Sequence, residues 1–173
     1  MSDPNTQTDT QEAKSLIDTN IWEVVGLTIT PEEQQEYNEQ FNREAWLTLL
    51  DEKLPKVLQE GEYKSFKAKV AELNMTPEQF VEKIKDIYST LDCDITADFD
   101  SCMEEVMTIF VEDQINYIER RLKSLKNQTE REVKLSLIKT LRDLFSQRQW
   151  DQMGVIFKKI DGYQLPEGLV LHL

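Results

Sequence analysis

The chain has 173 residues, of which 39% are hydrophobic and 31% charged, and its formal net charge is −13. This length suggests one domain or two small ones, and five glycines and five prolines are too few for a β-sandwich or a loop-rich enzyme. The negative charge disfavours general binding to nucleic acid or to an anionic membrane, because the phosphate groups would be repelled.

Residues 1–12 are polar and contain no apolar run, so we expect a disordered N-terminal segment without a signal peptide. No stretch is long and apolar enough to predict a membrane span, which favours a cytoplasmic protein that makes no membrane contact. Apolar residues at helical spacing then predict a first helix over residues 13–25, and we expect Gly26 to end it.

An apolar residue followed by Thr-Pro-Glu occurs twice, with Thr30 in the first copy and Thr76 in the second. Each threonine is a predicted N-cap, and the proline after it occupies the first helical position, where its missing N–H costs nothing. Glu33 and Gln79 lie three residues after the threonines and complete two capping boxes. The two copies therefore predict where two helices begin.

The first of these helices is predicted to run from Pro31 to about Glu60, with Gly61 as its end. Pro55 lies inside this span and has no backbone N–H to donate, so we expect a kink or a break near Lys53.

Later helices are predicted from apolar residues spaced three and four apart. Thr129 and Glu132 predict a third capping box, which would start the helix that continues to about Phe145. The longest helix is expected over about residues 99–126, and it would be about 40 Å long at 1.5 Å per residue. The other predicted helices cover about residues 63–73, 77–91 and 150–160.

These elements predict an all-α fold: a bundle of about six helices with one long central helix, antiparallel neighbours and no significant sheet. We expect residues 13–95 to form an acidic helical subdomain and residues 96–161 a helical subdomain that contains the long helix. The leucines of the C-terminal tail, residues 162–173, are predicted to dock on the core. A short strand added to the edge of a partner's sheet is the alternative for the tail.

Charge is distributed unevenly: residues 1–110 contain 9 Lys/Arg and 24 Asp/Glu, whereas residues 111–173 contain 11 and 9. The favoured interpretation is that basic helices pack beside acidic ones, within one chain or across a homodimer. The alternative is a basic patch in residues 120–142 for nucleic acid or an acidic partner. Nucleic acid is less favoured, because only Tyr117 offers a ring on which a base could stack. The candidate interaction residues are Arg120, Arg121, Lys123, Lys126, Arg131 and Lys134.

Acidic residues alternate along residues 92–100 between two predicted helices, which imitates the ligand spacing of a calcium-binding EF-hand loop. Ala97 stands where that loop needs glycine, and Met103 stands where it needs a bidentate glutamate. The favoured interpretation is a loop that caps the next helix, with Asp98 and Asp100 near the positive end of the helix dipole. A degenerate calcium site remains the alternative. Its candidate ligands are Asp92, Asp94, Asp98, Asp100 and Glu104.

Side chains for catalysis are scarce. His172 is the single histidine, which excludes His-dependent triads and the Glu-x-x-His motif of di-iron bundles. No Gly-rich loop follows a strand, so we predict no phosphate cradle, no cofactor and no enzyme activity. Cys93 and Cys102 are expected to be free thiols, and a disulfide between them is the alternative if the protein is exported.

Helix starts and apolar residues follow a recognisable order in four segments: Val25-Gly26-Leu27, Thr30-Pro31-Glu32-Glu33-Gln34, Gly61-Glu62-Tyr63-Lys64-Ser65-Phe66 and Met75-Thr76-Pro77-Glu78-Gln79-Phe80. Over about residues 16–105 this order resembles a family of short, acidic, all-helical bacterial domains of unknown function. The resemblance implies a small helical domain of bacterial origin, and it transfers no functional residue because that family has no assigned activity. The helix that contains Pro55 is longer here, and the C-terminal half has no counterpart in the family.

The sequence thus favours a non-catalytic protein–protein interaction or structural module, whose partner is another protein or a second copy of the chain. A degenerate EF-hand-like calcium-binding module and a nucleic-acid-associated protein that uses residues 120–142 are the two alternatives.

Overall fold

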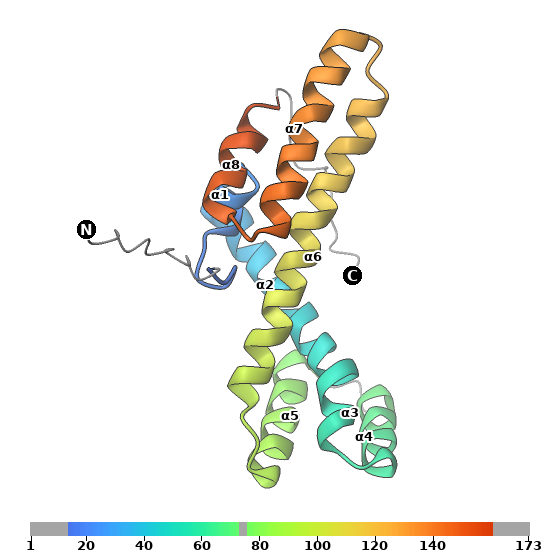
Figure 1. The fold of residues 1–173 in the computed structure, drawn as a ribbon. Helices are drawn as coiled ribbons and strands as arrows, with labels where there is room; N and C mark the ends of the chain where they lie inside the picture. The colour runs from blue at the N-terminus through green and yellow to red at the C-terminus, as the bar shows by residue number, and fades with distance from the viewer. Residues whose placement is uncertain (1–13, 73–75, 161–173) are drawn as a thin grey trace, which may run out of the picture.

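The computed structural model describes residues 14–72 and 76–160 of the chain (Figure 1). Within these ranges every regular element is helical, so the prediction of an all-α fold is confirmed. The predicted segments 1–12 and 162–173 lie outside the described residues. The helices are α1 (Ile21–Val24), α2 (Pro31–Thr48), the π-helical turn η1 (Leu49–Lys53), α3 (Leu54–Val57), α4 (Glu60–Glu72), α5 (Pro77–Leu91), α6 (Ile95–Lys123), α7 (Gln128–Ser146) and α8 (Trp150–Lys158).

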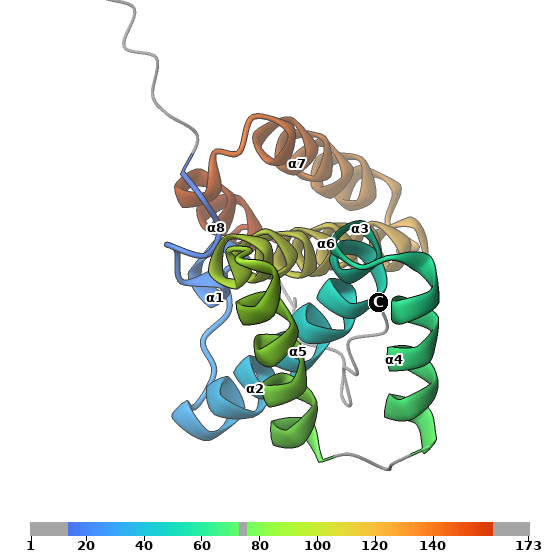
Figure 2. The same ribbon diagram turned by 90° about the horizontal axis from the view of Figure 1, so that it is seen from below.

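The long central helix predicted from the sequence is α6, whose 29 residues extend for about 43 Å. Figure 1 shows α7, α8 and α1 gathered around its C-terminal half, and α3, α4 and α5 around its N-terminal half. Seen from below, α7 lies on one side of α6, and α2 and α5 lie on the other (Figure 2). The helix α7 returns antiparallel to α6, so these two helices form a hairpin at one end of the molecule.

Both capping boxes predicted from the repeated Thr-Pro-Glu are confirmed. The Glu33 N–H donates to the Thr30 hydroxyl oxygen at 3.2 Å, and the Thr30 N–H donates to the Glu33 carboxylate at 2.8 Å. At the start of α5 the Gln79 N–H donates to Thr76 at 3.3 Å, and the Thr76 N–H donates to Gln79 at 3.1 Å. Each box satisfies two backbone donors that the first turn of a helix leaves unpaired.

The disturbance expected near Lys53 is present, because α2 passes through the π-helical turn η1 before it continues as α3. The predicted end at Gly61 is wrong. The chain leaves the helix at Leu58, which is extended, and Gly61 is the second residue of α4. A glycine in a first turn costs at most about 1 kcal/mol relative to alanine, so it did not prevent the new helix from starting there.

The first predicted helix, over residues 13–25, is reduced to the four residues of α1. Asn20 starts this short helix by accepting a hydrogen bond from the Trp22 N–H at 3.1 Å. Gly26 follows it with a φ of +69°, as expected for a residue that ends a helix. The residues before Asn20 form no helix, and the N–H groups of Leu16 and Ile17 are bound by the carboxylate of Glu104 on α6.

The third predicted capping box is also wrong. The helix α7 begins at Gln128, and its N-cap is Asn127, which accepts from the Glu130 N–H at 3.2 Å. Asparagine is as good an N-cap as threonine, so the earlier of two neighbouring candidates started the helix and placed Thr129 inside it.

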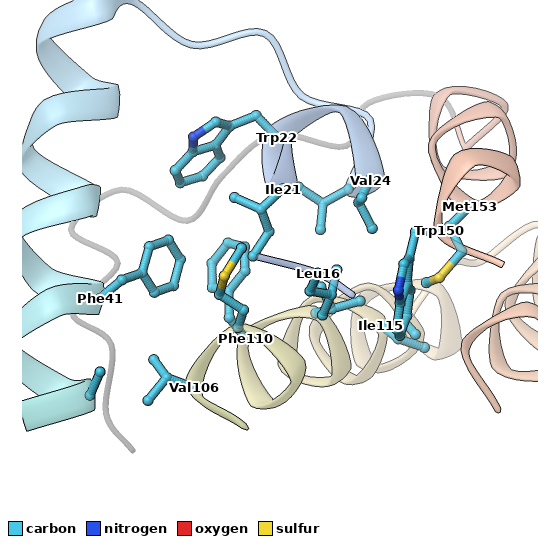
Figure 3. Packing of buried hydrophobic residues seen from close by; sticks show 14 of the residues in the cluster. Leu16, Ile21, Trp22, Val24, Phe41, Val106, Phe110, Ile115, Trp150 and Met153 are labelled. Carbon is cyan, nitrogen blue, oxygen red and sulfur yellow. The ribbon is translucent and has the colours of Figure 1, made fainter. Parts of the chain in front are cut away.

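The buried side chains from both predicted subdomains form one hydrophobic cluster. At its centre, the ring of Phe110 on α6 packs edge-on against Trp22, with centroids 5.7 Å apart, and against Phe41 on α2, at 5.3 Å (Figure 3). Such edge-to-face pairs stabilise a core beyond their buried area. The subdomain boundary predicted at residues 95–96 falls within the first turn of α6.

Candidate interaction surface

The candidate basic residues lie together at the free end of the α6–α7 hairpin, which extends beyond α8 in Figure 1. The last turns of α6, the connecting residues 124–127 and the first turns of α7 supply them. We call this end the basic tip, and define it by Arg120, Arg121, Lys123, Lys126, Arg131 and Lys134.

Apolar packing holds the hairpin together up to the tip. Leu122 on α6 and Ile138 on α7 are both buried, at 5% and 3% exposure, and belong to the common core. Asn127 starts α7 directly after the connection, so the turn is short and the two helices stay side by side. The basic tip is therefore carried by two packed helices and not by a long loop.

Two of the six basic side chains support the tip itself. Arg131 donates to the backbone carbonyl of Leu125 at 3.2 Å and so closes the connection. Lys134 forms an ion pair with Glu130, one turn earlier on α7, at 2.8 Å, and its side chain is only 14% exposed. Neither residue presents its full charge to solvent.

Glu119 of α6 binds basic side chains of both helices next to the basic tip. Arg142 of α7 donates to Glu119 at 2.5 Å and to Asn116 at 2.8 Å, and Lys123 pairs with the other oxygen of Glu119 at 2.7 Å. The hydrogen bonds from Arg142 and then from Lys123 lower the pKa of Glu119 below its usual value. This carboxylate thus fixes α7 to α6 and neutralises part of the charge of Lys123.

The remaining cations of the tip face solvent. Arg121 lies 5.7 Å from the centre of the Tyr117 ring and donates to its hydroxyl at 3.4 Å, a cation–π arrangement. Arg120 and Lys126 are exposed, and neither pairs with an acidic side chain among residues 14–72 and 76–160. Val133, on α7 within the tip, is 60% exposed. The tip therefore combines an exposed apolar side chain with two cations that form no ion pair with a described residue.

The segment that resembled a calcium loop does not form one. Only residues 92–94 separate α5 from α6. Asp92 takes a left-handed conformation that ends α5, and Asp94 is the N-cap of α6, accepting from Thr96 N–H at 2.9 Å and Ala97 N–H at 3.2 Å. The expectation that acidic residues here cap the next helix is met by Asp94.

Asp98, Asp100 and Glu104, the other three proposed calcium ligands, lie on α6. Asp98 accepts a hydrogen bond from the buried Tyr88 hydroxyl at 2.8 Å, and burial together with this bond raises the pKa of Tyr88. In the part of the chain that the structure describes, no three His, Cys, Asp or Glu side chains gather in a way that could hold a metal ion. The EF-hand-like ligand set is therefore not assembled.

Glu104 has a structural role that the sequence did not predict. Its Oε2 accepts hydrogen bonds from the Ser15 hydroxyl, from the Leu16 N–H at 2.9 Å and from the Ile17 N–H at 3.4 Å. Arg148 Nη1 lies 3.5 Å from the other carboxylate oxygen. One side chain thus anchors the start of the described chain to α6 across almost ninety residues of sequence.

A second contact fixes the same segment to α8. The indole N–H of Trp150 donates to the Lys14 carbonyl at 2.6 Å, and the Lys14 ammonium lies 3.6 Å from Asp151. Leu16, between these anchors, is fully buried. No local pattern in the sequence signals these bonds, because each joins residues more than eighty positions apart.

No family model matches the chain, and no curated protein or solved structure matches it. The resemblance over residues 16–105 rests on the residue order alone and stays a prediction.

The two cysteines are free thiols in the structure, as expected. Cys93 is exposed, whereas Cys102 on α6 is fully buried. Burial, opposed in part by the nearby Lys53 ammonium, raises the pKa of the Cys102 thiol to about 11. Cys102 therefore belongs to the packing of the core and is not a reactive nucleophile.

None of the described helices is long and apolar enough to cross a membrane. An open depression of about 580 Å³ lies between the 17–22 segment, α2 and α6. Its lining consists mainly of apolar side chains and amides, with Asp18 as the single charged residue among them. Thr19 adds a hydroxyl group to this lining.

Proposed function

We propose that this protein is a non-catalytic interaction module that binds an acidic protein surface through its basic tip. The observation that carries the proposal is the pair of exposed cations Arg120 and Lys126, which have no acidic partner among the described residues and lie at the projecting end of a chain whose net charge is −13. Uncommitted cations lose no existing ion pair when they bind, and they steer an oppositely charged partner toward one end of the molecule.

A protein partner is favoured over nucleic acid by two features of the tip. Val133 is exposed beside the basic residues, and apolar contacts are typical of the centre of a protein interface. The ring of Tyr117 already lies against Arg121 and offers no free face on that side for stacking. The acidic remainder of the chain would also repel a phosphate backbone.

The test compares two double variants that change the net charge equally. Arg120→Glu with Lys126→Glu removes the free cations of the tip. Lys56→Glu with Lys69→Glu changes two exposed lysines near the opposite end. Binding of fluorescently labelled poly-L-glutamate is measured by anisotropy at low and at physiological salt. We expect at least a tenfold weaker affinity for the tip variant and less than a twofold change for the control.

Equal losses in the two variants would contradict the proposal, because binding would then follow net charge and not the tip. A labelled DNA duplex is titrated in parallel. Tighter binding of the duplex than of poly-L-glutamate, weakening steeply with salt, would favour the nucleic-acid alternative instead.

A further inference from the structure

One face of α6 is left uncovered by the helices that pack on it. Glu105, Ile109, Glu112 and Arg120 are exposed, and Asn116 between them is half-buried and accepts a hydrogen bond from Arg142 at the edge of α7. Their spacing of three or four residues places them along one line of the helix. In Figure 1, α6 is visible along its whole length, with α2 behind it. These exposed side chains follow one line of α6 from Glu105 to Arg120, a residue of the basic tip.

Charge changes sign along this face. Glu105, Glu112 and Asp113 lie on its N-terminal half, and none of them forms an ion pair with another described residue. Arg120 lies on its C-terminal half, and Lys126 follows just beyond the end of the helix. The face thus carries uncommitted carboxylates at one end and uncommitted cations at the other.

The two halves are spaced symmetrically about Asn116. Glu112 and Arg120 are each four residues from it, which is about 6 Å along the helix axis. Glu105 is eleven residues before it, and Lys126 is ten residues after it. When two copies of such a face lie antiparallel, the acidic half of each copy lies opposite the basic half of the other.

We propose that this face of α6 binds a second copy of the chain, antiparallel and with the two-fold axis at Asn116. Arg120 of each copy then faces Glu112 and Asp113 of the other, so the same contact forms twice, as a two-fold interface requires. This inference rests on the proposed function and specifies it, since the acidic surface that the basic tip meets is supplied by the second copy.

The apolar part of the contact fits the same arrangement. Ile109 is 36% exposed and lies seven residues before Asn116, and Lys123 lies seven residues after it. In the antiparallel pair each Ile109 faces the aliphatic stem of Lys123 of the other copy, and the stem can cover it while the ammonium stays with Glu119. Because the other contacts are between exposed charges, the dimer is expected to weaken as salt is added.

The test uses two charge-reversal variants that repel themselves but attract each other. In Arg120→Glu, the tip carboxylates would face Glu112 and Asp113. In the double variant Glu112→Arg with Asp113→Arg, three arginines would face one another. Sedimentation velocity at low salt is expected to give a dimer for the wild type, a monomer for each variant alone, and a dimer for their equimolar mixture. Lys56→Glu, at the other end of the molecule, is the control that should remain dimeric.

A cysteine cross-link tests the direction of the contact. In a Cys93→Ser background, Asn116→Cys places a half-buried thiol at the proposed two-fold axis, while the native thiol Cys102 is fully buried. Oxidation with diamide is expected to give a covalent dimer from Asn116→Cys, and at least tenfold less from a cysteine at the exposed position Glu132 of α7, Glu132→Cys.

A wild-type monomer at every concentration and salt, or a dimer that persists in Arg120→Glu, would refute the α6 contact. Failure of this inference can be told apart from failure of the proposed function. A monomer that still binds poly-L-glutamate through Arg120 and Lys126 would leave the interaction module standing and would require an acidic partner other than this chain.

Discussion

Replacing Gly154 by alanine tests how α8 is seated on α1. A Cβ atom added at Gly154 would lie 2.0 Å from the backbone carbonyl oxygen of Glu23, whereas ordinary van der Waals contact begins at 3.4 Å. A backbone oxygen cannot rotate away as the end of a side chain can. The two helices must therefore separate by more than one ångström to admit the methyl group.

The loss of stability caused by this separation depends on the side chains that are buried where α1 and α8 meet. Trp22 on α1 and Met153 and Phe157 on α8 are buried in or beside it, at 3%, 0% and 0% exposure. Overpacking a close contact costs about 1–3 kcal/mol, and we expect the upper end because the clash is with backbone. A loss of about 3 kcal/mol lowers the melting temperature of a domain of this size by roughly 6–12 °C.

Gly61→Ala is the matched control. A Cβ atom there meets no other atom within 4 Å, and the residue lies in the first turn of the exposed helix α4. Alanine is favoured over glycine in a helix by up to about 1 kcal/mol, so the same substitution should be neutral or stabilising. Both variants are measured by urea and thermal unfolding, followed by circular dichroism at 222 nm. A stability of Gly154→Ala within about 0.5 kcal/mol of the wild type would refute the reasoning, because surface substitutions change stability by no more than that.

Three further predictions concern carboxylates and thiols. Glu104→Ala should lower the free energy of unfolding by about 3 kcal/mol, because it leaves the backbone donors that Glu104 binds without an acceptor. The control Glu105→Ala, on the exposed face of α6, should change the free energy of unfolding by less than about 0.5 kcal/mol. Equal effects of the two variants in urea unfolding would contradict this prediction. The pKa of Glu119 is lowered in the folded state, so its contribution to stability is present above its usual value of 4.5 and is lost as the pH falls below it. Glu119→Gln should therefore flatten the acid limb of stability against pH, and an unchanged limb would count against the network. With Ellman's reagent at pH 8, Cys93 alone should react in the native protein, and Cys102 should react only after urea is added; two reactive native thiols would disprove its burial.

Helix starts were predicted best where every interacting group lies within three residues of sequence. The boxes of Thr30 and Thr76 need only the residues that follow them, so they formed as expected. The box at Thr129 failed under the same rule, because Asn127 offered an equally good cap two residues earlier. Local capping rules identify the residues that could start a helix, but they do not decide between two neighbouring N-cap candidates.

The acidic segment shows why a spacing of ligands is not a site. Asp94 was used to start α6, and once that helix began, Asp98 and Glu104 pointed their side chains to partners on other elements. An EF-hand needs its ligands on a loop that bends around the ion. The regular geometry of a helix spreads the same residues along its axis instead.

The basic residues of the interaction surface could be named from the sequence, but their individual states could not. Composition indicated a basic stretch within an acidic chain, and helical periodicity placed it at the end of a long helix. Tertiary packing then brought Arg142 to Glu119 and left Arg120 and Lys126 without an acidic partner in the described part of the chain. Whether a surface cation is free depends on which side chains the fold brings near it. The residues next to it in the sequence do not determine this.

The sequence by itself determined the all-helical class, the central helix and the two capped helix starts, because hydrophobic periodicity and capping act over three to eight residues. Only the tertiary structure decided the backbone conformation of residues 14–20. Their pattern favoured a helix, but the N–H groups of Leu16 and Ile17 are bound by the carboxylate of Glu104, 88 residues after Leu16. Contacts between residues far apart in the sequence can override a local preference for a helix, and no local rule can foresee them.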